Sequence, residues 1–336
     1  MTAQFPARSL ADQYRHRSVL VTGGLGFVGS NLAMRLASYG ARVSLIDNLL
    51  PEGGGNRFHQ HTLREQAAIE VGDLRDVARH EPLLAGCEVI FHLAARTSHA
   101  DSMRAPLEDL EANVAATLAL LEGCRRHAPQ ARIVFTSTRQ LYGCPRWIPV
   151  DETHPIETVD VNAVHKLAAE QHLQLYSRVH GLPATILRLT NVIGPRMRIR
   201  DARQTFVGEW VRRLLQRQPL EVWGGSQQRD LLDVEDALDA LLLAGCHPAA
   251  VGQIFNVGHP QAERLDALAD RMIRVHGTGE RILREFPAER ARIDIGSYAT
   301  DSTRIRDQLG WSSHTDLDVT LSRTLNYYTQ YSEHYV

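Results

Sequence analysis

The sequence predicts an α/β fold, a Rossmann-type doubly wound parallel sheet followed by a smaller mixed α/β C-terminal lobe. Three observations carry this prediction. Short apolar runs typical of strands alternate with helical patterns as far as Leu189, and the first run leads directly into a glycine-rich turn. The alternation stops after Leu189, which predicts the second lobe. A chain of 336 residues is long enough for both.

The first element is a strand over Ser18–Thr22, which runs into a glycine turn and then a helical pattern. Glycine at such a turn lets a pyrophosphate lie against backbone N–H groups at the helix N-terminus, where the helix dipole also favours negative charge. We therefore expect a dinucleotide to bind here, in contact with Gly23, Gly26, Phe27, Val28 and Gly29.

Asp47 and Asn48 follow the second predicted strand, Ala41–Ile46. An acidic residue at this distance from the turn accepts hydrogen bonds from the adenosine ribose and repels a 2′-phosphate. The sequence therefore predicts NAD as the cofactor in preference to NADP. A turn-forming role is the alternative interpretation of Asp47, because Asp is common in the loops after strands.

Four further strands are predicted over 68–71, 89–93, 132–136 and 184–189, with a helix over 106–126. Ligands of doubly wound sheets bind at the carboxyl ends of the strands. The residues at those ends are therefore added to the expected cofactor contacts: Asp73, Leu74, Leu93, Ala94, Ala95, Thr97, Thr136 and Leu189.

An arginine-rich stretch over 195–203 and a helix over 206–216 begin the second lobe. A long helix over 234–244 indicates that the chain then returns to the sheet. A cleft between two interleaved lobes suits a small ligand. We expect an NAD-binding domain of residues 17–190, joined by residues 229–258, and a substrate-binding lobe of residues 191–228 and 259–336.

The composition excludes several classes of protein. With 37 Lys and Arg against 39 Asp and Glu, the formal net charge is −2, so the basic excess that nucleic-acid binding needs is missing. No stretch approaches the ~18 apolar residues of a membrane span, and the first residues lack the apolar run of a signal peptide. We expect a cytoplasmic protein without nucleic-acid or membrane partners. No metal site is predicted, because the four cysteines are widely spaced: Cys87, Cys124, Cys144 and Cys246.

Short motifs are spread along most of the chain: TGGLGFVG at 22–29, GDL at 72–74, HLAA at 92–95, STRQLYG at 137–143, KLAAE at 166–170, RLTNVIGPR at 188–196, RD at 229–230 and NVG at 256–258. From about Ser18 into the last helix, the sequence resembles the extended short-chain dehydrogenase/reductase superfamily, specifically its nucleotide-sugar epimerase and dehydratase branch. The resemblance implies NAD, a nucleotide-sugar substrate and a cofactor contact for Asn113. It also implies a homodimer built on the helix over 106–126 and the helix that carries Lys166.

Members of this family carry a Tyr four residues before the catalytic Lys, together with a Ser or Thr from the end of the fifth strand. Thr138 and Lys166 match that pattern, but the tyrosine position is Asn162. The resemblance implies that Lys166 binds the nicotinamide ribose and lowers the tyrosine pKa, whereas an amide cannot be a base. Lys166 is the only lysine of the chain, which is consistent with a retained cofactor contact; chance retention is the alternative.

Another group must therefore accept the proton of the sugar hydroxyl. His165 lies three residues beyond Asn162, near the same helix face, and an imidazole titrates in the right range. A solvated or packing role is the alternative, and the more common one, for such a histidine. The remaining candidates for the base are a water molecule and a residue that the sequence does not identify.

Arg139 and Gln140 stand where sugar 4,6-dehydratases carry the Asp and Glu that eliminate water. Neither side chain can perform that proton transfer, so a 4,6-dehydratase is disfavoured. Arg139 could instead pair with an acidic substrate group such as a uronate; a solvated or structural arginine is the alternative. The other expected substrate contacts are Thr97, Ser98 and His99 beside the sugar, and Asn191, Arg203 and Arg229 beside the diphosphate.

The sequence thus favours an NAD-dependent nucleotide-sugar epimerase, similar to a UDP-glucose 4-epimerase, in which Thr138 holds the reacting hydroxyl and Lys166 orients the cofactor. One alternative is another NAD-dependent oxidoreductase or isomerase reaction, on an acidic sugar. The other is a catalytically silent protein that binds NAD or a nucleotide sugar, because the lost group is the one that moves the proton. An Asn162→Tyr variant separates these hypotheses: activity gained from zero favours the silent protein, and loss of existing activity favours a divergent mechanism.

Overall fold

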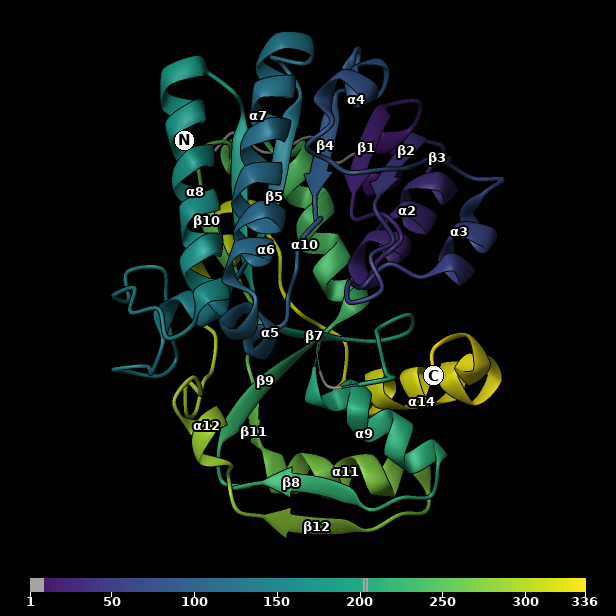
Figure 1. The fold of residues 1–336 in the computed structure, drawn as a ribbon, viewed down its shortest axis with the longest axis vertical. Helices are drawn as coiled ribbons and strands as arrows, with labels where there is room; N and C mark the ends of the chain where they lie inside the picture. Colours follow the sequence, from purple (N-terminus) through teal and green to yellow (C-terminus); the bar gives the residue numbers. More distant parts are fainter. Residues whose placement is uncertain (1–8, 202, 204) are drawn as a thin grey trace.

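The computed structural model describes residues 9–201, 203 and 205–336. Its main feature is a seven-stranded parallel sheet with the strand order β10-β6-β5-β4-β1-β2-β3 (Figure 1). This order confirms the predicted Rossmann-type sheet. The strands are β1 Ser18–Thr22, β2 Arg42–Asp47, β3 Ala68–Val71, β4 Val89–His92, β5 Arg132–Thr138, β6 Ala184–Leu189 and β10 Ile254–Val257.

Helices cover both faces of this sheet, which is why its strands are apolar without interruption. In β1, Val19 and Val21 pack in one core cluster and Leu20 packs in the other, as the two-residue period of a strand requires. The first cluster includes side chains of α2 Phe27–Ser38 and α10 Val234–Cys246. The second includes side chains of α4 Val77–Leu84, α7 Ala116–His127 and α8 Val161–His180.

The chain is helical throughout the predicted range 106–126, but a π-helical turn interrupts the regular α-helix. Helix α6 covers Pro106–Leu110, a π-helical turn covers Glu111–Ala115, and α7 follows. The wider π turn places the Asn113 side chain so that its Nδ2 donates to Arg96 O (3.1 Å) and to Asp109 Oδ1 (2.9 Å). Hydrophobic periodicity cannot reveal one extra residue in a helical turn, so the π turn could not be predicted from the sequence.

The second lobe lies in the lower half of Figure 1 and contains two small sheets. A three-stranded sheet has the order β11-β9-β7, and a two-stranded sheet pairs β12 with β8. Its strands are β7 Asn191–Ile193, β8 Leu220–Trp223, β9 Gln228–Asp233, β11 Ala262–Arg264 and β12 Arg281–Arg284. The remaining helices are α1 Leu10–Tyr14, α3 Arg57–Leu63, α5 His99–Arg104, α9 Phe206–Leu215, α11 Leu265–His276, α12 Ala288–Ala291, α13 Thr303–Leu309 and α14 Leu317–Tyr331, with short 3₁₀ turns at Arg139–Tyr142, Pro248–Ala250 and Ser332–His334.

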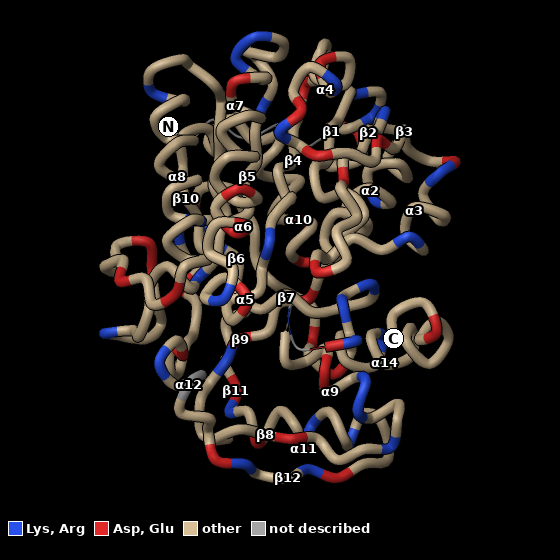
Figure 2. Tube along the Cα trace, in the orientation of Figure 1, with Lys and Arg blue, Asp and Glu red and all other residues tan. Residues whose placement is uncertain are grey.

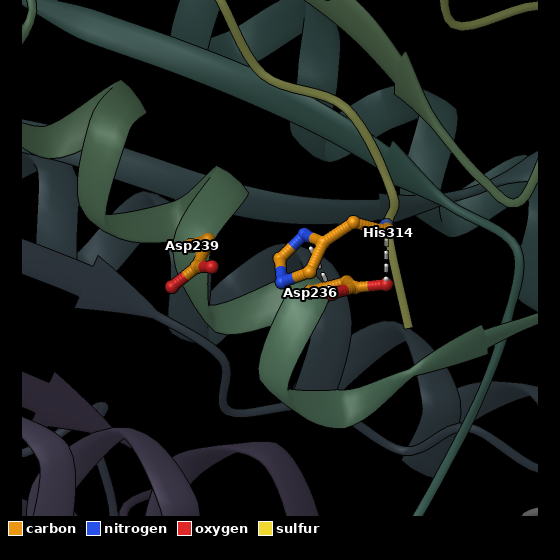
Figure 3. A group of neighbouring side chains, drawn as sticks. All are labelled: Asp236, Asp239 and His314. Atoms are coloured by element: carbon orange, nitrogen blue, oxygen red, sulfur yellow. Dashed lines mark hydrogen bonds and ion pairs between the residues drawn. The ribbon is translucent and has the colours of Figure 1, made fainter. Parts of the chain in front are cut away.

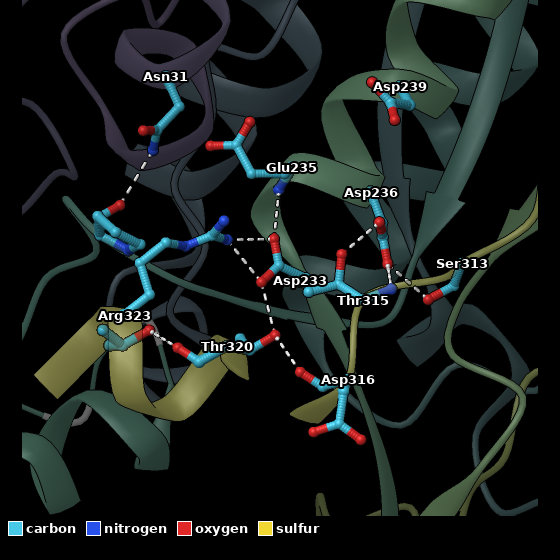
Figure 4. Close-up of polar contacts among 12 residues, drawn as sticks. Asn31, Asp233, Glu235, Asp236, Asp239, Ser313, Thr315, Asp316, Thr320 and Arg323 are labelled. Carbon is cyan, nitrogen blue, oxygen red and sulfur yellow. Dashed lines mark hydrogen bonds and ion pairs between the residues drawn. The ribbon is translucent and has the colours of Figure 1, made fainter. Parts of the chain in front are cut away.

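Two buried carboxylates fix the C-terminal segment to α10 (Figure 4). Asp233, the N-cap of α10, accepts hydrogen bonds from Arg323 Nη2 and Thr320 Oγ1 of α14. Asp236, one turn later, accepts from Ser313 Oγ and from the backbone and side chain of Thr315. The sheet and the C-terminal helix are therefore held together by hydrogen bonds as well as by apolar packing.

Charged residues of both signs are interspersed over both lobes (Figure 2). Many of them form ion pairs along single helices, such as Arg125 with Glu122 on α7 and Arg212 with Glu209 on α9. Such a surface fits the net charge of −2. Within the described ranges, no helix is both long enough and apolar enough to cross a membrane.

Candidate functional site

A cavity of about 490 Å³ lies at the carboxyl ends of the parallel strands. Backbone and side chains from the glycine turn, the strand ends, α8 and the start of the second lobe all contribute to its wall. The structure brings most of the residues predicted from the sequence onto this wall: Gly23, Gly26, Phe27, Val28, Gly29, Asp47, Asn48, Asp73, Leu74, Leu93, Ala94, Ala95, Thr97, His99, Thr136, Thr138, Arg139, Asn162, Lys166, Leu189 and Asn191.

Five other predicted residues lie off the wall of this cavity. Ser98 caps α5, and Asn113 lies in the π turn. His165 pairs with Asp109, and Arg203 Nε lies 3.1 Å from Asp101 Oδ2. Arg229 Nη2 donates to Asp294 Oδ1 (2.9 Å). The wall also contains a loop that the sequence analysis did not single out. This loop follows the second strand and includes three consecutive glycines, 53–55, which could have identified it from the sequence.

The glycine turn is shaped for close approach of a ligand to the backbone. Gly23 has a φ of +69°, and a Cβ atom there would lie 2.7 Å from Ala94 N. A Cβ atom on Gly29 would lie 2.1 Å from Gly23 O, so the start of α2 can pack on the turn only without a side chain. Gly26 caps α2 without a side-chain hydrogen bond, which leaves helix N–H groups for an anion. The turn therefore fits a dinucleotide pyrophosphate.

Asp47 accepts hydrogen bonds from the backbone of the glycine turn and also lines the cavity. Its Oδ2 accepts from Leu25 N (3.0 Å) and its Oδ1 accepts from Leu49 N (2.9 Å), so it braces the glycine turn against the next loop. Burial raises the pKa of this carboxyl group, against the lowering by these two bonds. Each oxygen keeps a lone pair for a ribose hydroxyl, because a carboxylate accepts up to about four hydrogen bonds.

Lys166 lies on the same wall, on the first turns of α8. Its Nζ donates to Thr136 O (2.9 Å) and lies 4.6 Å from the centre of the Phe135 ring. Burial lowers the pKa of Lys166 to about 8, although Asp109 and Glu170 act in the opposite direction. An ammonium group has three donors, so two remain for a ligand.

Asn162 is locked by a buried carboxylate that sequence analysis missed. Its Nδ2 donates to Arg96 O (2.7 Å) and to Asp109 Oδ2 (3.1 Å). Asp109 is 1% exposed and also accepts from Asn113 Nδ2 and from His165 Nδ1 (2.8 Å). Because both N–H bonds of the Asn162 amide are used inside the protein, the amide can offer a ligand only its acceptor oxygen.

His99 forms a second histidine and aspartate pair, and this one lies on the cavity wall. Its Nδ1 is 2.9 Å from Oδ2 of Asp160, whose side chain is fully buried; this is an ion-pair distance without the geometry of a hydrogen bond. Asp160 also accepts from Gln140 Nε2 (3.0 Å) and Ala163 N (2.8 Å). Burial acts to raise the pKa of Asp160, but the hydrogen bonds and the His99 ring outweigh it and leave the pKa below its usual value. Asp160 is therefore an anionic partner for the imidazole.

Arg139, which is partly buried, and Arg229, which is buried, lie at the edge of the second lobe but differ in their partners. Arg139 lies on the wall, where its Nη2 donates to Asn191 Oδ1 (3.1 Å) and its guanidinium lies 5.1 Å from the centre of the Tyr298 ring. Arg229 is neutralised by Asp294 and also donates to backbone oxygens. Burial lowers the pKa of Arg229 to about 10. Only Arg139 is available to a molecule in the cavity.

Asp236, Asp239 and His314 lie close enough together to hold a metal ion (Figure 3). Their hydrogen bonds explain the cluster without one. Asp236 accepts four hydrogen bonds from the segment over 313–315, and Asp239 accepts from Arg35 Nη1 (2.9 Å). The His314 side chain is 69% exposed. We assign this cluster to the attachment of the C-terminal segment.

Comparisons with known proteins agree with this geometry. Residues 19–258 match the model of the NAD dependent epimerase/dehydratase family. The chain is 30% identical over 321 residues to UDP-glucose 4-epimerase of Mycolicibacterium smegmatis, which covers 94% of this chain and 99% of that protein. It is 29% identical over 335 residues to UDP-glucuronic acid decarboxylase 1 of Xenopus tropicalis, over 98% of this chain and 76% of that protein. The solved structure of UDP-glucose 4-epimerase from Thermotoga maritima with UDP-glucose is 28% identical, with a TM-score of 0.85 over 94% of this chain and 99% of that one.

Proposed function

The chain belongs to the NAD dependent epimerase/dehydratase family, its cofactor is NAD, and within that family we propose that it is a cytoplasmic nucleotide-sugar epimerase, similar in reaction to a UDP-glucose 4-epimerase. One observation carries the proposal. Thr138, Asn162 and Lys166 lie on the wall of the same cavity as the glycine turn. Two of the UDP-glucose 4-epimerases among the relatives support it.

Bound NAD would supply the hydride chemistry, by which a sugar carbon is oxidised and then reduced from the opposite face. The glycine turn binds the pyrophosphate, and the free donors of Lys166 bind the nicotinamide ribose. Thr138 Oγ1 accepts from Gln140 N (3.1 Å), which leaves its own O–H to orient the reacting hydroxyl. The Asn162 oxygen is an acceptor that helps to hold the sugar but takes no proton.

The proton of that hydroxyl goes to His99 in this proposal. His99 lies on the cavity wall, its Nδ1 faces the buried carboxylate of Asp160, and its Nε2 has no partner among the residues that the structure describes. A histidine held by a carboxylate is a common general base, because the carboxylate orients the ring and stabilises its protonated form. His165 has a similar carboxylate partner, but it lies off the wall.

The test is a proton NMR time course of NAD-loaded protein with a panel of nucleotide sugars, including neutral hexoses, N-acetylhexosamines and uronates. We expect a new anomeric signal from one epimer, without net formation of NADH. Binding of NAD and of one nucleotide sugar without any turnover would instead establish the silent binding protein.

We further propose a homodimer through α6 and α8. Three apolar side chains on these helices are exposed: Leu107 by 73%, Val164 by 49% and Val179 by 59%. An apolar face of this kind is typical of a protein interface. Leu107→Glu is expected to shift the sedimentation coefficient from that of a dimer to that of a monomer, whereas Val319→Glu, at an exposed site on α14, should not.

A further inference from the structure

Arg139 and Asn191 form a pair of donors directed at the cavity from neighbouring strands. Arg139 follows β5 and Asn191 begins β7 just after β6, and the register pairs Thr138 with Leu189. Arg139 Nη2 donates to Asn191 Oδ1. Since a guanidinium can only donate, this bond fixes the amide with its oxygen toward Arg139 and its Nδ2 free for another acceptor.

The donors that remain on this pair have no acceptor. Arg139 Nη1 and Asn191 Nδ2 are both buried and without a hydrogen-bond partner in the part of the chain that the structure describes, and so is Ser137 Oγ. All three residues line the cavity. A buried N–H group without a partner destabilises a protein, so such groups mark the place of a ligand or a water molecule.

Arg139 also has no carboxylate in direct contact within the described residues, although Asp230 acts on it through space. The Asp230 carboxylate instead accepts hydrogen bonds from Thr190 Oγ1 (2.6 Å) and Thr300 Oγ1 (2.5 Å). Asp294, the other nearby acidic residue, forms an ion pair with Arg229. A cation in this position attracts an anion into the cavity.

We propose that Arg139 and Asn191 bind the carboxylate of a sugar acid, so that the substrate is a nucleotide uronate. The inference rests on the proposed function, in which Thr138 holds the reacting hydroxyl. Arg139 and Thr138 line the same cavity, so the proposal puts the donors of Arg139 beside the sugar. A carboxylate offers two oxygens to two adjacent donors, and a neutral hydroxymethyl group cannot satisfy them.

The test measures binding to NAD-loaded protein by calorimetry, with matched pairs of ligands that differ only in the sugar: UDP-glucose and UDP-glucuronate, and dTDP-glucose and dTDP-glucuronate. UDP and dTDP serve as the ligands without a sugar. One charged hydrogen-bond pair changes affinity by about 10- to 100-fold. We expect the acidic member of one pair to bind tighter by that factor.

Arg139→Gln is expected to lower the affinity for the uronate to that of the neutral sugar and to leave the neutral sugar and the nucleotide unchanged. Asn191→Ala, which removes less packing, should have the same effect to a smaller degree. Arg146→Gln is the matched control, because Arg146 pairs with Glu157 and lies off the cavity wall.

Three results separate the outcomes. Equal affinity of the wild-type protein for both members of every pair overturns the uronate proposal and leaves the epimerase proposal intact. A loss in Arg139→Gln that is the same for uronate, neutral sugar and nucleotide assigns the pair to the diphosphate and also overturns it. If NAD binds but no nucleotide sugar does, the proposed function itself fails.

Discussion

The cofactor side and the catalytic side of the cavity are built in different ways. On the cofactor side, the important contacts are made by the backbone: Gly23 needs its positive φ and Gly29 needs its missing side chain. On the catalytic side, the contacts are made by side chains: Asn162 donates a hydrogen bond to Asp109, and His99 lies within ion-pair distance of Asp160. The first kind of construction tolerates almost no substitution, whereas the second can exchange its parts. Asn162, which the sequence resemblance places at the family's tyrosine position, lies on the second side.

Gly29→Ala is expected to have the largest effect, and it tests the backbone construction of the cofactor side. The added Cβ would lie 2.1 Å from Gly23 O, so the helix and the turn must separate. We expect NAD binding to be lost and the free energy of unfolding to fall by more than about 3 kcal/mol, as for a severe core clash. Thermal unfolding and NAD titration measure both. Gly86→Ala is the control: its Cβ meets nothing within 4 Å, so only the strain of its positive φ is expected.

His99→Gln tests the catalytic side with a smaller effect. Loss of a general base lowers the rate by about 10²- to 10⁴-fold, and we expect that decrease in kcat with unchanged NAD affinity. His127→Gln is matched to it, because His127 also faces a carboxylate, Glu81, at 3.4 Å but lies away from the cavity. Wild-type activity in His99→Gln would exclude this histidine as the base.

Asn162→Tyr introduces the tyrosine that the family resemblance implies at this position. It tests whether the surrounding side chains can accommodate a phenol ring. Tyrosine cannot donate to both Arg96 O and Asp109, so we expect activity to fall and the free energy of unfolding to decrease by about 1–3 kcal/mol. Urea unfolding and the NMR assay measure the two effects. Asn326→Tyr, on the exposed side of α14, should change neither. A gain of activity would show that the network around Asp109 is not part of a working mechanism.

The titration of Lys166 is the finest test. Because it is the only lysine, ¹³C-lysine labelling gives one side-chain signal, and we expect a midpoint near pH 8 in the protein without NAD. Between about pH 8 and the ordinary value near 10.4, the unfolded chain binds more protons than the folded one. The contribution of Lys166 to the free energy of unfolding therefore rises with pH over that window. A midpoint above pH 10 would contradict the burial of this ammonium.

The same contrast explains what the sequence could predict. The first two strands, the glycine turn and Asp47 lie within 30 consecutive residues, so their spacing can be read from the sequence. The contacts of Asp109 with Asn162 and of His99 with Asp160 join residues more than 50 positions apart. Only the fold brings such pairs together, and the π turn that positions Asn113 leaves no periodic signal. The sequence therefore located the cavity but left the proton acceptor open between His165, a water molecule and an unidentified residue, and His165 lies outside the cavity wall.

The burial of Lys166 has a practical consequence for the study of local opening. A protease specific for lysine has one cleavage site in the chain, between residues 166 and 167, and that site lies inside α8 with its side chain 5% exposed. Cleavage into two fragments of similar length then requires the first turns of α8 to unfold. The rate of this single cut would report how often the cavity wall opens, and its slowing by NAD would measure how firmly the cofactor closes it.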